Sequence, residues 1–74
     1  MRITVKLFAT FRSGRFAVET RDYPAGTAVN DIVAELTLAD QKLGMLLVNG
    51  RPVGLDRLLA DGETLALFPL LDGG

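Results

Sequence analysis

The sequence predicts an α+β fold in which a mixed β-sheet carries one main helix across one face. Three stretches of its 74 residues support this prediction. Residues 2–9 alternate apolar and polar side chains with the period of two that a half-buried strand requires. Apolar residues recur with helical spacing between Val29 and Leu36. Asn49-Gly50 follows a short apolar run and is a strong signal for a β-hairpin.

The first two predicted strands form a hairpin. The first strand turns Ile3, Val5 and Leu7 toward the core. Ser13-Gly14 supplies turn residues, and residues 16–21 alternate again as an antiparallel partner. We expect this second strand to bury Val18.

The connection between these strands carries two arginines, Arg12 and Arg15. They could bind a phosphate or contact a partner. An ordinary solvated turn is the alternative interpretation.

The helix is predicted from an apolar stripe at positions i, i+3, i+4 and i+7, formed by Val29, Ile32, Val33 and Leu36. Thr27 is the predicted N-cap, with its hydroxyl accepting from an amide one turn on. Asp31 in the first turn suits the positive end of the helix dipole. In so small a domain the stripe faces the core.

In the second half of the chain, the sequence predicts two strands, a short returning strand and one helical turn. Residues 45–48 form a strand, and residues 51–53 return from the Asn-Gly turn. Pro52 confines this returning strand to an edge, because proline cannot donate to a ladder. Residues 55–59 have the spacing of a helical turn, and residues 64–68 form the last strand.

If the last strand inserts beside the first and parallel to it, this order of elements gives the β-grasp (ubiquitin-like) arrangement. We predict a domain over residues 1–69 and a flexible C-terminal tail over residues 70–74. The predicted core is Ile3, Val5, Leu7, Val18, Val29, Ile32, Val33, Leu36, Leu65 and Leu67.

Large apolar side chains are also expected on the sheet face opposite the helix. Alternation places Phe8 there on the first strand and Phe68 on the last, with Met45 or Leu47 on the strand beside it. Such patches on small monomers usually mark a partner surface. The alternative is that one or two of these side chains wrap an edge and join the core.

The composition argues against catalysis by this chain. It contains no cysteine and no histidine, so a thiolate zinc site, a disulfide and the usual general base near neutral pH are excluded. The net charge of −1 provides no attraction toward nucleic acid. With no apolar run long enough for a membrane span and no signal peptide, we expect a soluble cytoplasmic domain.

The last residues, 70–74, end in Gly73-Gly74. Extended, these five residues reach roughly 17 Å at about 3.3 Å per residue. Glycines let such a tail enter a channel too narrow for side chains, so an enzyme could select its α-carboxylate for adenylation. A sulfur nucleophile could then attack the acyl carbon and leave a thiocarboxylate. A frayed chain end is the alternative.

Several segments along the whole chain match the sequence pattern of a known family: residues 7–9, 26–29, 48–50 and 58–69, together with Gly73-Gly74. They resemble the MoaD/ThiS family of ubiquitin-like sulfur carriers. The end is similar to the small subunit of molybdopterin synthase, whose tail typically runs Phe-Phe-Pro-Pro-x-x-Gly-Gly. Phe68 and Pro69 match this pattern, whereas Leu67 and Leu70 replace a Phe and a Pro. Residues 48–53 also look like the carriers of the thiamin branch.

The resemblance implies a carrier and not an enzyme. Its partners would be a ubiquitin-activating-type adenylyltransferase that uses Mg-ATP, and a large molybdopterin-synthase-like subunit or a thiazole synthase. The product would be a molybdenum or tungsten pterin cofactor; a thiamin carrier, a protein modifier or an interaction module are the alternatives. No cofactor or metal is expected to bind the chain itself. The expected site residues are Gly73 and Gly74 for the chemistry and Phe8, Leu47, Phe68, Pro69, Leu70 and Leu71 for partner binding.

Overall fold

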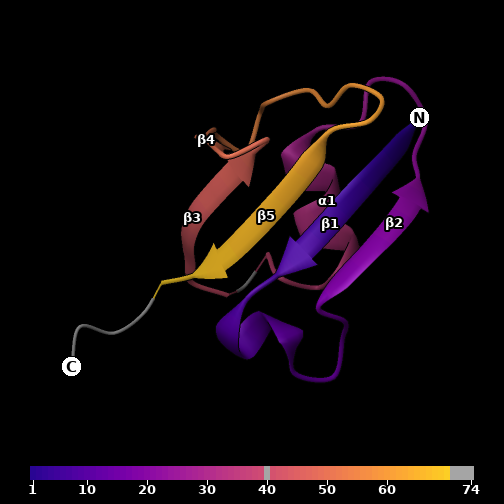
Figure 1. The fold of residues 1–74 in the computed structure, drawn as a ribbon. Coiled ribbons are helices and arrows are strands. Elements are labelled where there is room, and N and C mark those ends of the chain that lie inside the picture. The colour runs from indigo at the N-terminus through magenta and orange to yellow at the C-terminus, as the bar shows by residue number, and fades with distance from the viewer. Residues whose placement is uncertain (40, 71–74) are drawn as a thin grey trace.

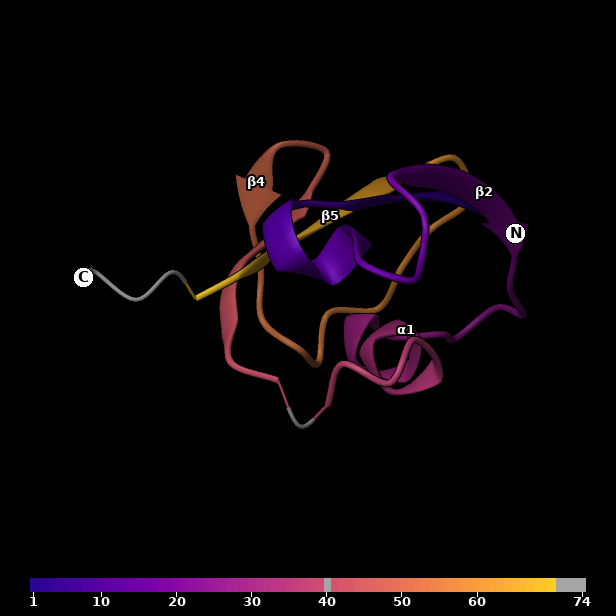
Figure 2. The same ribbon diagram turned by 90° about the horizontal axis from the view of Figure 1, so that it is seen from below.

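The computed structural model describes residues 1–39 and 41–70 and confirms the predicted fold class (Figure 1). Its elements are β1 Arg2–Leu7, the 3-10 helix η1 Ala9–Arg12, β2 Val18–Asp22, α1 Val29–Glu35, β3 Leu43–Val48, β4 Arg51–Pro52 and β5 Thr64–Pro69. The strands form one sheet in the order β2-β1-β5-β3-β4. β5 runs parallel to β1 and antiparallel to β3, which is the β-grasp arrangement. Figure 2 shows α1 lying along one face of this sheet.

The core lies between α1 and the sheet, and nine of the ten predicted core residues are buried in it. The period-two and helical patterns therefore identified the inward faces of β1, β5 and α1. Further side chains complete the core: Phe11, Tyr23, Leu38, Leu46, Val48 and Leu59. Neither helix in the described part of the chain is long and apolar enough to cross a membrane.

The prediction that Val18 is buried is wrong, because 59% of its surface is exposed. The register pairs Val18 with Lys6, on the face that points away from α1. β2 is an edge strand, so its helix-side position Arg21 reaches the rim of α1 and pairs with Glu35 at 2.9 Å. Phe11 from η1 enters the core, although the sequence placed it in a loop.

The two arginines of the first connection differ in role. Arg15 donates from Nε to the carbonyl oxygen of Leu36 at 3.0 Å and from Nη1 to that of Phe11 at 3.2 Å. It therefore ties η1 to the C-terminal end of α1, where carbonyl groups lack partners within the helix. Arg12 is exposed.

The predicted N-cap of α1 is also wrong. Ala28 occupies the cap position, and the Thr27 hydroxyl donates to the carbonyl oxygen of Pro24 at 2.7 Å. The Asp31 carboxylate accepts from the Ala28 N–H at 2.8 Å, so the first turn is stabilised from within the helix. Ala28 also forms an isolated bridge with Leu58, and where a helical turn over residues 55–59 was predicted the chain has a turn at 55–56 followed by this bridge.

The predicted hairpin at Asn49-Gly50 is confirmed. Both residues have positive φ, 50° and 80°, as the favoured two-residue hairpin turn requires. Pro52 lies in β4, at the edge of the sheet. Of the predicted tail, 70–74, only Leu70 lies within the described residues, so the predicted domain boundary stays a prediction.

Candidate functional site

Phe8 and Phe68 lie side by side because β1 and β5 are paired in parallel up to Leu7 and Leu67. The Phe8 N–H continues the ladder by donating to the Leu67 carbonyl oxygen at 3.2 Å. The next side chains along the two strands point away from α1, since successive side chains alternate between faces. The two half-buried rings stack with their centroids 4.1 Å apart and an angle of 7° between their planes.

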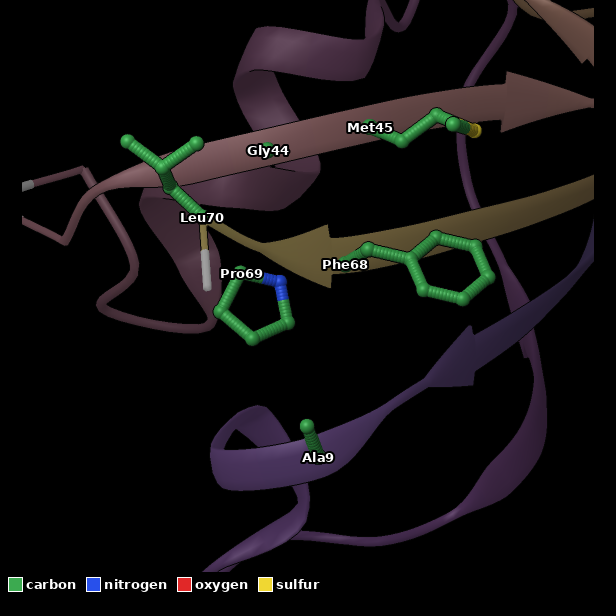
Figure 3. Close-up of a pocket in the computed structure, with 6 residues that line it drawn as sticks. All are labelled: Ala9, Gly44, Met45, Phe68, Pro69 and Leu70. Carbon is green, nitrogen blue, oxygen red and sulfur yellow. The ribbon is translucent and has the colours of Figure 1, made fainter. Parts of the chain in front are cut away.

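A β-bulge in β3 lies opposite Phe68. Leu43 pairs with Pro69 and Leu46 with Leu67, so Gly44 and Met45 together oppose one residue of β5. Leu46 and Val48 point into the core, whereas Met45 and Leu47 lie on the outer face. Met45 is 52% exposed, and Figure 3 shows it beside Phe68. Both residues that the sequence offered as alternatives therefore occupy this face.

An apolar groove of about 490 Å³ opens where these strands end (Figure 3). It is lined by Ala9, Gly44, Met45, Phe68, Pro69 and Leu70. None of these side chains carries a charge. Met45 and Leu70 are more than half exposed, so apolar surface that water contacts here can be buried by a partner.

The end of β5 lies unusually close to β3. A Cβ on Gly44 would meet the carbonyl oxygen of Pro69 at 2.5 Å. The Leu70 N–H donates to the Lys42 carbonyl oxygen at 2.9 Å. Sequence reasoning missed Gly44 as a site residue because the predicted strand, 45–48, began one residue after it, whereas β3 begins at Leu43. A glycine inside a strand is a recognised sign of a bulge or close backbone approach.

The predicted partner-binding residues are thus only partly gathered in the groove. Phe68, Pro69 and Leu70 line it, and Phe8 stacks on Phe68 at its margin. Leu47 shares the face but does not line the groove. Leu71, Gly73 and Gly74 lie outside the described residues, so their predicted roles stay predictions.

The groups with shifted pKa values lie away from the groove. Hydrogen bonds from Arg57 (2.8 Å) and from the Ala60 N–H (2.7 Å) hold the pKa of Glu63 below its usual value. Burial, followed by the hydrogen bond to Glu35 (2.6 Å), raises the pKa of Tyr23 to about 12. Over residues 1–39 and 41–70, no three metal-ligating side chains come together. The groove can therefore bind apolar groups, but it offers no acid, base or metal ligand of its own.

The fold and the groove are those of a ubiquitin-like domain with an uncharged surface at the end of its last strand. The ThiS family model matches residues 5–74, and the chain belongs to this MoaD/ThiS family of ubiquitin-like sulfur carriers. Members of the family are small carrier proteins. No curated protein matches the chain in sequence.

Several solved structures share the fold. A proposed molybdopterin converting factor subunit 1 from Pyrococcus furiosus is 29% identical, with a TM-score of 0.78 over 96% of this chain and 99% of its own. Small archaeal modifier protein 1 of Haloferax volcanii is 26% identical, with a TM-score of 0.76 over 95% and 98%. A chain from the Helicobacter pylori complex of molybdopterin-converting factor subunits 1 and 2 is 18% identical, with a TM-score of 0.68 over both full chains, a likeness that shows the fold alone.

Proposed function

We propose that this chain is a sulfur carrier whose C-terminal Gly74 is adenylated and converted to a thiocarboxylate for molybdenum or tungsten pterin cofactor synthesis. The observation that carries the proposal is the position of the apolar groove. Phe68, Pro69 and Leu70 line it and directly precede the glycine-ended segment in sequence. A partner that buries this groove therefore meets the residues that lead to Gly74.

The chemistry takes two steps. A Gly74 carboxylate oxygen attacks the α-phosphorus of Mg-ATP bound to the activating partner, and pyrophosphate leaves. Hydrosulfide, as the sulfur nucleophile, then attacks the acyl carbon, AMP leaves with the bonding electron pair, and loss of the sulfur's proton to solvent yields the thiocarboxylate. The partner, a ubiquitin-activating-type adenylyltransferase, supplies the groups that stabilise both transition states. This chain supplies recognition through the groove and a carboxylate without neighbouring side chains, and it acts as co-substrate in the cytoplasm.

The proposed sulfur acceptor is the large subunit of a molybdopterin synthase. The 29% identity to the Pyrococcus furiosus protein over nearly the whole of both chains supports this branch. The Helicobacter pylori relative was solved in complex with subunit 2 of its converting factor. A large-subunit partner would place its own apolar side chains against Met45 and Phe68, where burial of a fully exposed large side chain contributes about 1.5–3 kcal/mol and burial of these half-exposed ones contributes proportionately less.

Two observations favour other outcomes of the same activation chemistry. The similarity to small archaeal modifier protein 1 supports a protein modifier, in which an amine of a target protein would take the place of sulfur. The ThiS family match supports transfer of sulfur to a thiazole synthase. Both alternatives use the same Gly74 carboxylate and the same groove.

The deciding experiment is intact-mass measurement after incubation of the full chain with its adenylating enzyme, Mg-ATP and sulfide. Exchange of one oxygen for sulfur, localised to Gly74 by fragmentation, supports a sulfur carrier. Adducts on added proteins support a modifier, and an unchanged mass contradicts both. Adding the purified large subunit or the thiazole synthase to the loaded chain then identifies the acceptor that removes the sulfur.

A further inference from the structure

We infer that Gly44 is a positioning residue that fixes the direction in which the C-terminal segment leaves the domain. The inference rests on the proposed function and assigns a role to a residue outside the tail. It starts from the β3 bulge, where Gly44 and Met45 oppose Phe68.

Gly44 is glycine for a reason that differs from that of four other described glycines. Gly14, Gly26, Gly50 and Gly62 all have positive φ, which favours glycine through the backbone alone. Gly44 has no such φ, so its own conformation tolerates a side chain.

The obstacle at Gly44 is the end of β5. A Cβ there would lie 2.5 Å from the Pro69 carbonyl oxygen, 2.8 Å from the Pro69 carbonyl carbon and 3.0 Å from the Leu70 nitrogen. All three are backbone atoms, which cannot swing aside as a flexible side chain can. At Gly54, which also lacks a positive φ, the nearest atom is only the carboxylate oxygen of Asp56 at 3.1 Å.

The close approach lets β3 hold the end of β5. Leu43 pairs with Pro69, and the Leu70 N–H donates to the Lys42 carbonyl oxygen at 2.9 Å. Pairing with β1 ends earlier, at Leu67. Among the described residues, β3 therefore provides the ladder contacts that orient Pro69 and Leu70.

The direction set at Leu70 matters for the residues that follow it. Four more residues span at most about 13 Å, so the position and direction of Leu70 limit where an activating enzyme can meet Gly74. Gly44 also lines the apolar groove, so one bulge sets both the partner surface and the exit direction. Fixing the backbone of one residue before the partner binds raises the fraction of molecules in the productive conformation about fivefold to thirtyfold.

The test compares Gly44→Ala with the matched control Gly54→Ala in the adenylation assay. We expect Gly44→Ala to lower kcat at least about fivefold, with a smaller change in KM because Met45 and Phe68 still line the groove. Gly54→Ala should load at the wild-type rate. Amide hydrogen exchange gives a second readout without the enzyme: the Leu70 N–H should exchange faster in Gly44→Ala and unchanged in Gly54→Ala.

A second measurement does not depend on whether Gly44→Ala folds. In the wild-type chain the Leu70 N–H donates to the Lys42 carbonyl oxygen, so we expect it to exchange more slowly than an amide of an unstructured peptide. Exchange at the unprotected rate would contradict the close pairing of β3 with the end of β5.

The outcomes separate the two proposals. If the wild-type chain is loaded and Gly44→Ala loads as fast as Gly54→Ala, Gly44 has no positioning role. A fall in kcat with an unchanged exchange rate at Leu70 also contradicts it. If the wild-type chain is never loaded, the proposed function fails, and the exchange measurement alone still shows whether Gly44 holds Leu70.

Discussion

The stacked rings of Phe8 and Phe68, 4.1 Å apart, follow directly on the buried pair Leu7 and Leu67 of the same two strands. Neighbouring residues on these two paired strands therefore face opposite sides of the sheet. The leucines face α1 and stabilise the fold, while the phenylalanines face outward beside the apolar groove. A partner can therefore bury one face without disturbing the packing of the other.

Phe68→Ala is expected to weaken partner binding more than it destabilises the domain. The half-buried ring loses its stacking on Phe8, worth about 0.5–1.5 kcal/mol beyond area burial. Partner affinity should fall by about 2 kcal/mol or more, as for an aromatic anchor at the centre of an interface. Calorimetric titration with the large subunit and thermal unfolding of the free chain measure the two effects.

The matched control is Leu67→Ala on the other face of the same strand. Leu67 is fully buried, so this change should cost about 2–5 kcal/mol of stability. Equal affinity together with a collapsed Tm for Phe68→Ala would place Phe68 among the core residues instead.

Deletion of Gly73-Gly74 is expected to abolish thiocarboxylate formation and to leave the Tm within about 4 °C of the full chain, because changes that leave the packed domain untouched stay within about 0.5 kcal/mol. Intact mass and thermal unfolding of the same sample measure both effects. A large loss of stability would show that the two glycines are structural.

Tyr23 is expected to titrate near pH 12 in the folded protein. Burial and the hydrogen bond to Glu35 raise its pKa to about 12, against about 10 in an unfolded chain. Because the folded state favours the neutral phenol, the stability it contributes is complete below pH 10 and is lost as the pH rises through 12. Tyrosinate absorbance follows this directly, since the chain has one tyrosine and no tryptophan.

Glu35→Gln separates the two causes of this shift. This change should lower the pH midpoint of the Tyr23 titration while leaving it above 10, since burial is the larger cause of the raised pKa. A midpoint near 10 in the folded wild-type protein would contradict the buried hydrogen bond.

Glu63→Gln is expected to lower the Tm at pH 7 by no more than about 5 °C, because Arg57 and Glu63 form a partly exposed ion pair. The lowered pKa of Glu63 means that its contribution is present above the ordinary glutamate pKa and is lost as the pH falls through the folded value. The difference in Tm between Glu63→Gln and the wild type should therefore disappear at acid pH. Thermal unfolding at a series of pH values checks this, and a difference independent of pH would assign the effect to packing.

The features that could be predicted from the sequence are those whose cause is local. The alternation of residues 2–9 and the stripe of α1 each record which face of one element is apolar. Asn49-Gly50 specifies its own turn, because these residue types accept positive φ. The segment 70–74 and the lack of histidine and cysteine likewise pointed to a carrier before any fold was known.

Only the tertiary structure decided the features that depend on a second segment. Val18 lies outside the core because its register with Lys6 sets its face, whereas Phe11 from η1 lies inside the core. Gly44 matters because the backbone of Pro69, distant in sequence, passes within contact distance of it. Alternation along one strand carries no information about which neighbour it pairs with or how closely, and pairing is what brought the groove and the chain's exit together.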